Sequence, residues 1–212
     1  MVAKRYDLHV HSWFSNDCKS NPKDIIKIAI KNGLSGLAIT DHNSIKFHHE
    51  NFKSNELLII PGVEVSTNRG HVIGLGIKET IKRRLSPEET VEEILDMGGL
   101  AIIPHPFDFT RRGIGKIIYD LKNIAVETVN GSCPVKFFNT KAKQMAAKSN
   151  LPETGGSDAH RLKDIGMAYT LTTEEITTAD DLLEAIRKQR TTGEGSNLTI
   201  REKIIRTFQI HF

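Results

Sequence analysis

The sequence is poor in cysteine, in aromatic residues and in charge of one sign. Its two cysteines, Cys18 and Cys133, exclude a scaffold built on several disulfides and a zinc site of four thiolates. Aromatic residues make up 6% of the chain, and 29 Lys and Arg against 26 Asp and Glu leave a net charge of +3. A surface that tracks long nucleic acids needs clustered Lys and Arg and stacking rings, so this balance disfavours such a partner.

Long apolar segments are missing as well. No run approaches the roughly 18 apolar residues of a membrane span, and the start, MVAKRYDLHVHS, has no signal-peptide core. We therefore expect a soluble, cytoplasmic protein with no membrane partner. The chain has 212 residues, of which 38% are hydrophobic, so it can form an ordinary core.

Short apolar runs alternate with amphipathic patterns along the chain. We expect strands at 6–11, 36–42, 57–65, 71–77, 100–104, 124–129 and 167–172, and helices at 22–32, 44–53, 87–97, 115–122, 135–149 and 179–189. Such an order is typical of βα units with parallel strands. No linker divides the chain, so we predict one domain over 1–212, with 196–212 as an appended, helical segment.

The histidines gather at the ends of the expected strands. Six of the nine lie there: His9, His11, His42, His71, His105 and His160. In βα folds the carboxyl ends of the strands and the loops after them build the active site. For the other three, His48, His49 and His211, and for the two cysteines, we expect a structural role.

Two pairs of residues are spaced so that both members leave a strand on one face: His9 with His11, and Asp158 with His160. Asp7 has the same spacing from His9 and is a candidate acceptor that orients an imidazole. A single histidine at a strand end is more often structural than a ligand. The whole set, in βα order, favours a metal site instead.

The residue types restrict the metal. Imidazoles and carboxylates without thiolates suit Zn²⁺, Mn²⁺ or Fe²⁺ in a hydrolytic site. More than four such ligands indicate two to three divalent ions, and a carboxylate such as Glu64 can bridge two of them.

Five segments, taken together, resemble the PHP (polymerase and histidinol phosphatase) family. They are Asp7-Leu-His-Val-His-Ser12, Thr40-Asp-His-Asn43, Pro61-Gly-Val-Glu64, Pro104-His-Pro-Phe107 and Gly156-Ser-Asp-Ala-His160. Each is weak alone, but five in the family's order are specific. The resemblance implies an α/β fold, a distorted seven-stranded (β/α)7 TIM-like barrel, with a trinuclear metal site at the carboxyl ends of the strands.

The resemblance also implies a ligand set. The first metal would be held by His9, His11, Glu64 and Asp158, the second by Glu64, His71 and His105, and the third by Asp17, His42 and His160. We choose Asp17 over Asn16 because a carboxylate is the better ligand for a hard metal. His71 follows an expected tight hairpin at 67–70, which is similar to the family's short form of that segment.

The activity implied is metal-dependent hydrolysis of phosphoesters, with a metal-activated water as the nucleophile. Arg111 and Arg112, just after the strand that ends at His105, are candidate phosphate contacts, although a solvated surface role is as good an interpretation. The substrate stays open between a small phosphorylated metabolite, a nucleotide or short oligonucleotide, and histidinol phosphate. Two rival functions also stay open: a non-catalytic module related to polymerase-associated PHP domains, and amide or C–N bond hydrolysis.

Overall fold

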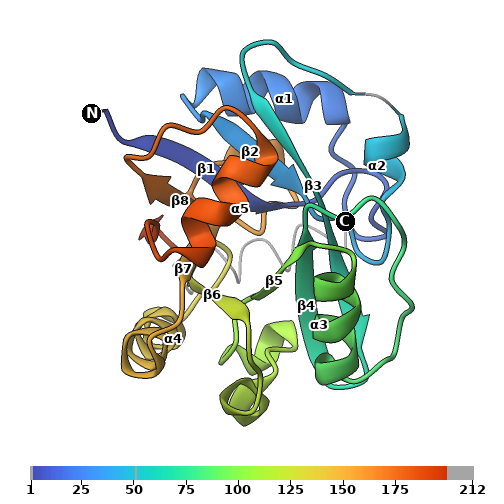
Figure 1. The fold of residues 1–212 in the computed structure, drawn as a ribbon. Coiled ribbons are helices and arrows are strands. Elements are labelled where there is room, and N and C mark those ends of the chain that lie inside the picture. The colour runs from blue at the N-terminus through green and yellow to red at the C-terminus, as the bar shows by residue number, and fades with distance from the viewer. Residues whose placement is uncertain (1, 51, 200–212) are drawn as a thin grey trace.

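The computed structural model describes residues 2–50 and 52–199, and within these ranges nine strands form one sheet. The strands are β1 (Lys4–Val10), β2 (Gly36–Ile39), β3 (Leu58–Thr67), β4 (Gly70–Leu75), β5 (Leu100–Ile103), β6 (Ile124–Asn130), β7 (Glu153–Gly156), β8 (Ala168–Thr172) and β9 (Thr192–Gly195). Their order across the sheet is β7-β6-β5-β4-β3-β2-β1-β8-β9. The sheet curls into a nearly closed barrel, around which the helices lie (Figure 1).

Helices follow most of the parallel strands. The α-helices are α1 (Pro22–Lys31), α2 (Lys46–His49), α3 (Pro87–Asp96), α4 (Lys136–Ser149) and α5 (Ala179–Arg187), and the 3₁₀ helices are η1 (Phe109–Arg111), η2 (Gly115–Tyr119) and η3 (Leu162–Asp164). Local sequence explains where several begin: Ser86 caps α3 and Thr178 caps α5, each within a capping box. No helix of the described residues is long and apolar enough to cross a membrane.

The expected seven-stranded count needs correction, because the described residues form nine strands and four of the pairings are antiparallel. These are β1 with β8, β3 with β4, β4 with β5, and β8 with β9. The turn between β3 and β4 leaves no room for a crossover helix, so the two strands form the hairpin expected at 67–70. Strand β9 was not expected because Thr192–Gly195 is short and rich in glycine. The helix expected at 115–122 is the 3₁₀ helix η2, and most of the segment 196–212, with His211, lies outside the described residues.

The barrel closes where β7 and the loop after it approach β1 and β8. The backbone N–H of Asp158 donates to the carbonyl of His9 over 2.7 Å, and the N–H of His11 donates to Ala159 over 3.0 Å. The approach is close enough to require glycine, since a Cβ on Gly156 would lie 2.4 Å from the Cβ of His9. Residues far apart in the chain thus share one seam.

The core fills the barrel and leaves one end for polar groups. Leu100 and Ile102 of β5 belong to a buried cluster that includes Leu182, Leu183 and Ile186 of α5, whereas Ala101 and Ile103, which alternate with them, pack in a second cluster with α3 and α4. The Arg187 guanidinium donates to the carbonyls of Gly98 and Gly99, just before β5 begins. Helix α5 therefore covers the amino ends of the strands, and the carboxyl ends remain available for a site.

His48 has the structural role expected of it. The backbone N–H of Gly62, in the middle of β3, donates to His48 Nε2 over 3.1 Å. The imidazole therefore satisfies a buried backbone donor beside the strand that carries Glu64.

Candidate metal centre

The carboxyl ends of the parallel strands, with the adjacent amino end of the antiparallel strand β4, bring together all nine residues predicted as metal ligands. His9 and His11 lie at the end of β1, and Glu64 lies on β3. His71 is on β4, and the loops after β1, β2, β5 and β7 carry Asp17, His42, His105, Asp158 and His160. Residues separated by up to 151 positions therefore line one cluster, because the strands that precede them are neighbours in the closed sheet.

Glu64 lies at the middle of the cluster and is buried. Its Oε1 lies 3.0 Å from His71 Nδ1 and 3.3 Å from His105 Nε2. Its Oε2 faces imidazole nitrogens at 3.3, 3.4 and 3.1 Å, those of His9, His11 and His42. One carboxylate thus divides five imidazoles into two sets, an arrangement suited to bridging two cations.

Asp158 forms the opposite wall. Its Oδ1 lies 3.5 Å from His11 Nε2, and its Oδ2 pairs with Arg111 Nη1 at 3.1 Å. Asp158 has a positive φ of 52°, in the left-handed region that few residues other than glycine adopt. The backbone bond from its N–H to His9 holds it in that conformation at the seam of the barrel.

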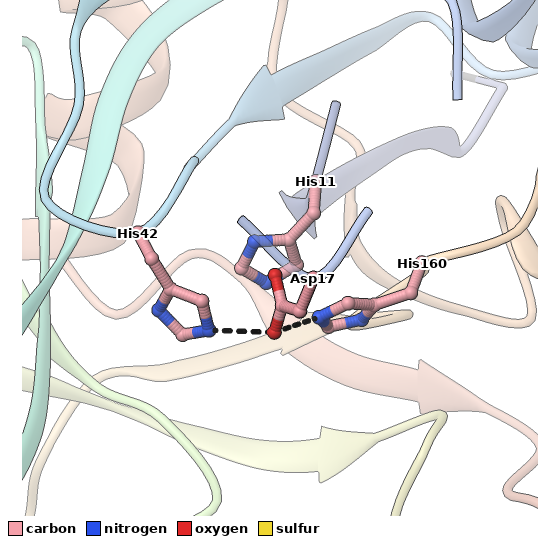
Figure 2. Close-up of side chains that lie close together, drawn as sticks. All are labelled: His11, Asp17, His42 and His160. Carbon is pink, nitrogen blue, oxygen red and sulfur yellow. Dashed lines mark hydrogen bonds and ion pairs between the residues drawn. The ribbon is translucent and has the colours of Figure 1, made fainter. Parts of the chain in front are cut away.

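A more exposed group lies at the mouth (Figure 2), where the Asp17 carboxylate stands between two histidines. Asp17 Oδ2 is 3.4 Å from His42 Nε2 and 3.1 Å from His160 Nε2. The His11 and His160 rings stack with their centroids 4.2 Å apart. It is Asp17, the carboxylate chosen from the sequence over its neighbour Asn16, that reaches these nitrogens.

The predicted ligands are better placed to bind divalent cations than to hydrogen-bond to one another. Five buried imidazole nitrogens make no hydrogen bond to any described residue, although carboxylates lie close to several of them; they belong to His9, His11, His42, His71 and His105. Buried polar atoms without partners are rare in folded proteins, and those of His9, His11, His42 and His71 face the carboxylates of Glu64 and Asp158. The possible ligand atoms form four groups, and within each group they lie within 4.8 Å of one another, close enough for all of them to contact a single cation. The groups are His11, Asp17, His42 and His160; His9, His105 and Asp158; His9, His11 and Glu64; and His42, Glu64 and His71.

The electrostatics of the cluster favour the ligand forms of several groups. Burial raises the pKa of the Glu64 carboxyl, but the surrounding histidines, His9 foremost, hold that pKa well below its usual range. Burial also raises the pKa of the Asp158 carboxyl, but the positive charges of Arg111 and His9 outweigh burial and hold that pKa well below its usual range. Burial and the neighbouring His160 lower the pKa of His11 to about 3, so its imidazole is neutral. Ionised carboxylates and neutral imidazoles are the forms that bind metals.

The family models decide the identity of this fold and site. Residues 7–150 match the PHP domain, and residues 136–191 match the PHP-associated family. The chain belongs to the PHP family. The first match covers seven of the nine predicted ligands, all but Asp158 and His160. The recognition of the family from its sequence motifs is therefore confirmed.

Relatives of this PHP protein include characterised and uncharacterised chains. An uncharacterised Methanocaldococcus jannaschii protein is 37% identical over 187 residues, which span 84% of this chain and 75% of that one. A Haemophilus influenzae 5′-3′ exoribonuclease is 33% identical over 122 residues, or 50% of this chain and 44% of that enzyme.

Solved structures share the fold at low sequence identity. PsfC from Pseudomonas syringae superposes with a TM-score of 0.75 at 18% identity, covering 99% of this chain and 98% of PsfC. A lesion-specific endonuclease from Pyrococcus furiosus superposes with a TM-score of 0.66 at 17% identity, covering 91% of this chain and 58% of that one.

The two arginines predicted as phosphate contacts differ in their burial. Arg111 is largely buried beside Asp158, and burial lowers its pKa less than the carboxylates of Asp158 and Glu64 raise it, so the guanidinium stays charged. Arg112 is exposed and has a left-handed backbone with φ of 58°. Its exposure matches the solvated surface role.

The orienting role expected of Asp7 is wrong. A bulge in β1 between Asp7 and Val10 breaks the alternation of side chains, so Asp7 and His9 do not share a face. The Asp7 carboxylate instead accepts the backbone N–H groups of Ser157 and Gly166, both over 2.8 Å. The acceptor for His9 is Glu127 of β6, whose Oε1 lies 3.0 Å from His9 Nδ1. The sequence offers no motif for Glu127, only an acidic residue inside a largely buried strand.

Proposed function

We propose that this PHP domain is a metal-dependent phosphoesterase whose nine donors hold two to three divalent ions, Zn²⁺, Mn²⁺ or Fe²⁺. The observation that carries the proposal is the set of orphaned imidazole nitrogens around two ionised carboxylates, Glu64 and Asp158. When bound, such ions acidify a water to a nucleophile near neutral pH and neutralise charge on phosphoryl oxygens. The exoribonuclease relative supports the same reaction class.

The protein's own residues would bind and orient the phosphate. Arg111 is the cation nearest the donors, and its Nε has no hydrogen bond to any described residue. A guanidinium can grip two oxygens of one phosphoryl group, which orients the ester for in-line attack. Asp158 pairs with Nη1 of the same guanidinium, so Arg111 is held in position before substrate binds.

The substrate class we favour is a nucleotide or a short oligonucleotide. Phe109, two residues before Arg111, is 77% exposed, and Phe137 at the start of α4 is 64% exposed. The Phe109 ring packs edge-on against Phe138 with centroids 5.6 Å apart, which leaves ring surface open to solvent. Exposed rings beside a phosphate-binding cation suit the base of a nucleotide, because bases stack on aromatic side chains whatever their sequence.

Phosphatase assays on metal-loaded protein test the activity. We expect hydrolysis of aryl phosphates and nucleotides that a chelator abolishes and Mn²⁺ or Zn²⁺ restores. Asp158→Asn keeps the side-chain volume but weakens a ligand and removes the charge that pairs with Arg111. It should therefore abolish turnover and lower the melting temperature of the metal-free protein without preventing folding. Fully metallated protein that hydrolyses no phosphoester in a broad screen would favour the non-catalytic module instead.

Matched substrates test the substrate class. Adenosine 5′-monophosphate should be hydrolysed with a higher kcat/KM than ribose 5-phosphate, and Phe109→Ala with Phe137→Ala should remove the difference. Tyr119→Ala, which changes another exposed ring on η2, is the control and should leave the ratio unchanged. Equal kcat/KM for the two substrates in the unaltered protein would contradict base stacking without contradicting the phosphoesterase.

A further inference from the structure

Behind the donor cluster lie two polar side chains of β6 that no predicted ligand set includes. Glu127 and Asn130 are buried, with exposed fractions of 2% and 0%. Three positions apart, they would leave a regular strand on opposite faces. The pairing of β6 with β7 contains a bulge between Glu127 and Val129, and this extra residue turns both side chains to the same side, where Asn130 Nδ2 donates to Glu127 Oε2 over 2.9 Å.

Glu127 contacts two of the nine donors in two different ways. Its Oε1 lies 3.0 Å from His9 Nδ1, and its Oε2 accepts the backbone N–H of His105 over 2.8 Å. His105 has a positive φ of 33°, a conformation costly for a residue with a Cβ. The carboxylate therefore orients one ring directly and holds the other residue through its backbone.

Asn130 extends this contact to a third donor. Its Nδ2 also lies 3.2 Å from Asp158 Oδ2, the oxygen that pairs with Arg111. His9, His105 and Asp158 are themselves one of the groups whose ligand atoms lie within 4.8 Å of one another. All three members of that group are thus held by the same pair of side chains from a neighbouring strand.

The chemistry of a carboxylate defines what Glu127 can do. An ionised carboxylate only accepts hydrogen bonds, so the nitrogen of His9 that faces it must carry the proton. In the neutral imidazole, Nε2 is then the nitrogen with the free lone pair, and Nε2 is the atom that faces Glu64 and Asp158. Gly156 makes the contact possible, since a Cβ there would lie 2.9 Å from Glu127 Oε1.

We propose that Glu127, assisted by Asn130, is a positioning residue that fixes the His9 tautomer and holds His9, His105 and Asp158 in ligating geometry. The inference rests on the metal binding proposed above. Glu127 binds no metal and touches no substrate; it acts through residues of three different strand ends, and it does so before any ion is bound.

The test measures Zn²⁺ affinity and the protonation of His9 in Glu127→Gln. Glutamine keeps the volume, but its amide N–H₂ would face N–H groups that themselves donate hydrogen bonds. We therefore expect Zn²⁺ to bind about 10–100-fold more weakly at the site. In ¹⁵N-histidine spectra of the Zn²⁺-loaded protein, the Nδ1–H signal of His9 should shift or exchange with water faster. Glu153→Gln is the matched control. Glu153 begins β7, and its carboxylate accepts a hydrogen bond over 3.1 Å from the Oγ1 of Thr128, which is not one of the nine predicted metal ligands.

A second variant separates positioning from folding. Asn130→Ala removes the bond to Asp158 but leaves the carboxylate on His9, so Zn²⁺ affinity should fall while the His9 signal stays as in the unaltered protein. Melting in chelator reports the stability of each variant without metal. Glu127→Gln with the original Zn²⁺ affinity and the original His9 signal overturns the inference, and an affinity lost only in proportion to stability does so too. Unaltered protein that takes up no Zn²⁺ would instead overturn the proposed function.

Discussion

Two groups within the donor cluster differ in how the protein holds them. The inner group is His9, His11, Glu64 and Asp158, whose side chains are at most 2% exposed. The rim group is Asp17, His42 and His160, with side-chain exposures of 50%, 23% and 24%. Inner donors come from strands or from the seam of the barrel, whereas Asp17 comes from a loop.

The difference predicts two kinds of metal site. Each inner donor is fixed by contacts that exist without metal, so little ordering accompanies binding there. The rim group is joined through a single carboxylate oxygen, Asp17 Oδ2, and faces water, which competes for the ion. We expect tight, slowly exchanging metal in the inner group and weaker, exchangeable metal at the rim.

Removing the Glu64 carboxylate should have the largest effect. Glu64→Gln keeps the volume but loses the charge that five imidazoles face, so at least two metals should be lost and kcat/KM should fall by more than about 100-fold. Elemental analysis and phosphatase kinetics measure both. Retention of full metal content would show that the inner group does not depend on Glu64.

Removing Asp17 should affect the rim alone. Asp17→Ala is expected to lose one bound metal and most of the activity, while the metal of the inner group stays bound during dialysis. Asn16→Ala is the matched control one residue away and should keep both metal and activity. The reverse result from this pair would mean that the loop after β1 presents Asn16, not Asp17, to the rim.

The two adjacent arginines test the phosphate contact. Arg111→Gln removes a buried, charge-assisted hydrogen bond worth about 1.5–3 kcal/mol, which corresponds to roughly a 10–100-fold rise in KM for a phosphoester. Arg112→Gln should leave KM unchanged because that side chain is exposed. Equal effects of the two substitutions would contradict the assignment of Arg111.

The smallest effect is expected far from the donors, at the start of α5. The Asp181 carboxylate accepts hydrogen bonds from Thr177 and Thr178, which lower its pKa to about 2. A lowered pKa in the folded state stabilises the fold above the ordinary carboxyl pKa of about 4, and that stabilisation is lost as pH falls toward 2. Asp181→Asn should therefore lower the melting temperature slightly at pH 6, less at pH 3, and leave metal content unchanged at pH 7.

The sequence predicted the donors better than it predicted what supports them. His9, His11, Asp158 and His160 carry their spacing in the chain, and their place after apolar strands indicated a shared end of the sheet. Glu127 has no such pattern, because its role depends on a bulge in β6, and a strand buried at almost every position shows no hydrophobic alternation that could reveal the extra residue.

The same limit explains the error at Asp7. Its spacing from His9 implies a shared face only in a regular strand, and the bulge in β1 removes that regularity. Strand β9 escaped prediction for a different reason: residues 192–195 have neither apolar alternation nor β-branched bulk beyond Thr192, and the strand forms because β8 offers an edge to pair with.

Strand β1 has one further consequence, which concerns time. It pairs with β2, close in the chain, but its other neighbour is β8, more than a hundred residues later. On a ribosome that adds about 5–20 residues per second, the edge of β1 that later pairs with β8 stays unpaired for roughly 10–30 seconds. The inner donors cannot converge until the loop carrying Asp158 has been made, so the nascent chain acquires its cation-binding capacity late. In refolding experiments, this long-range pairing should make recovery of the metal site slower than formation of α1 and β2.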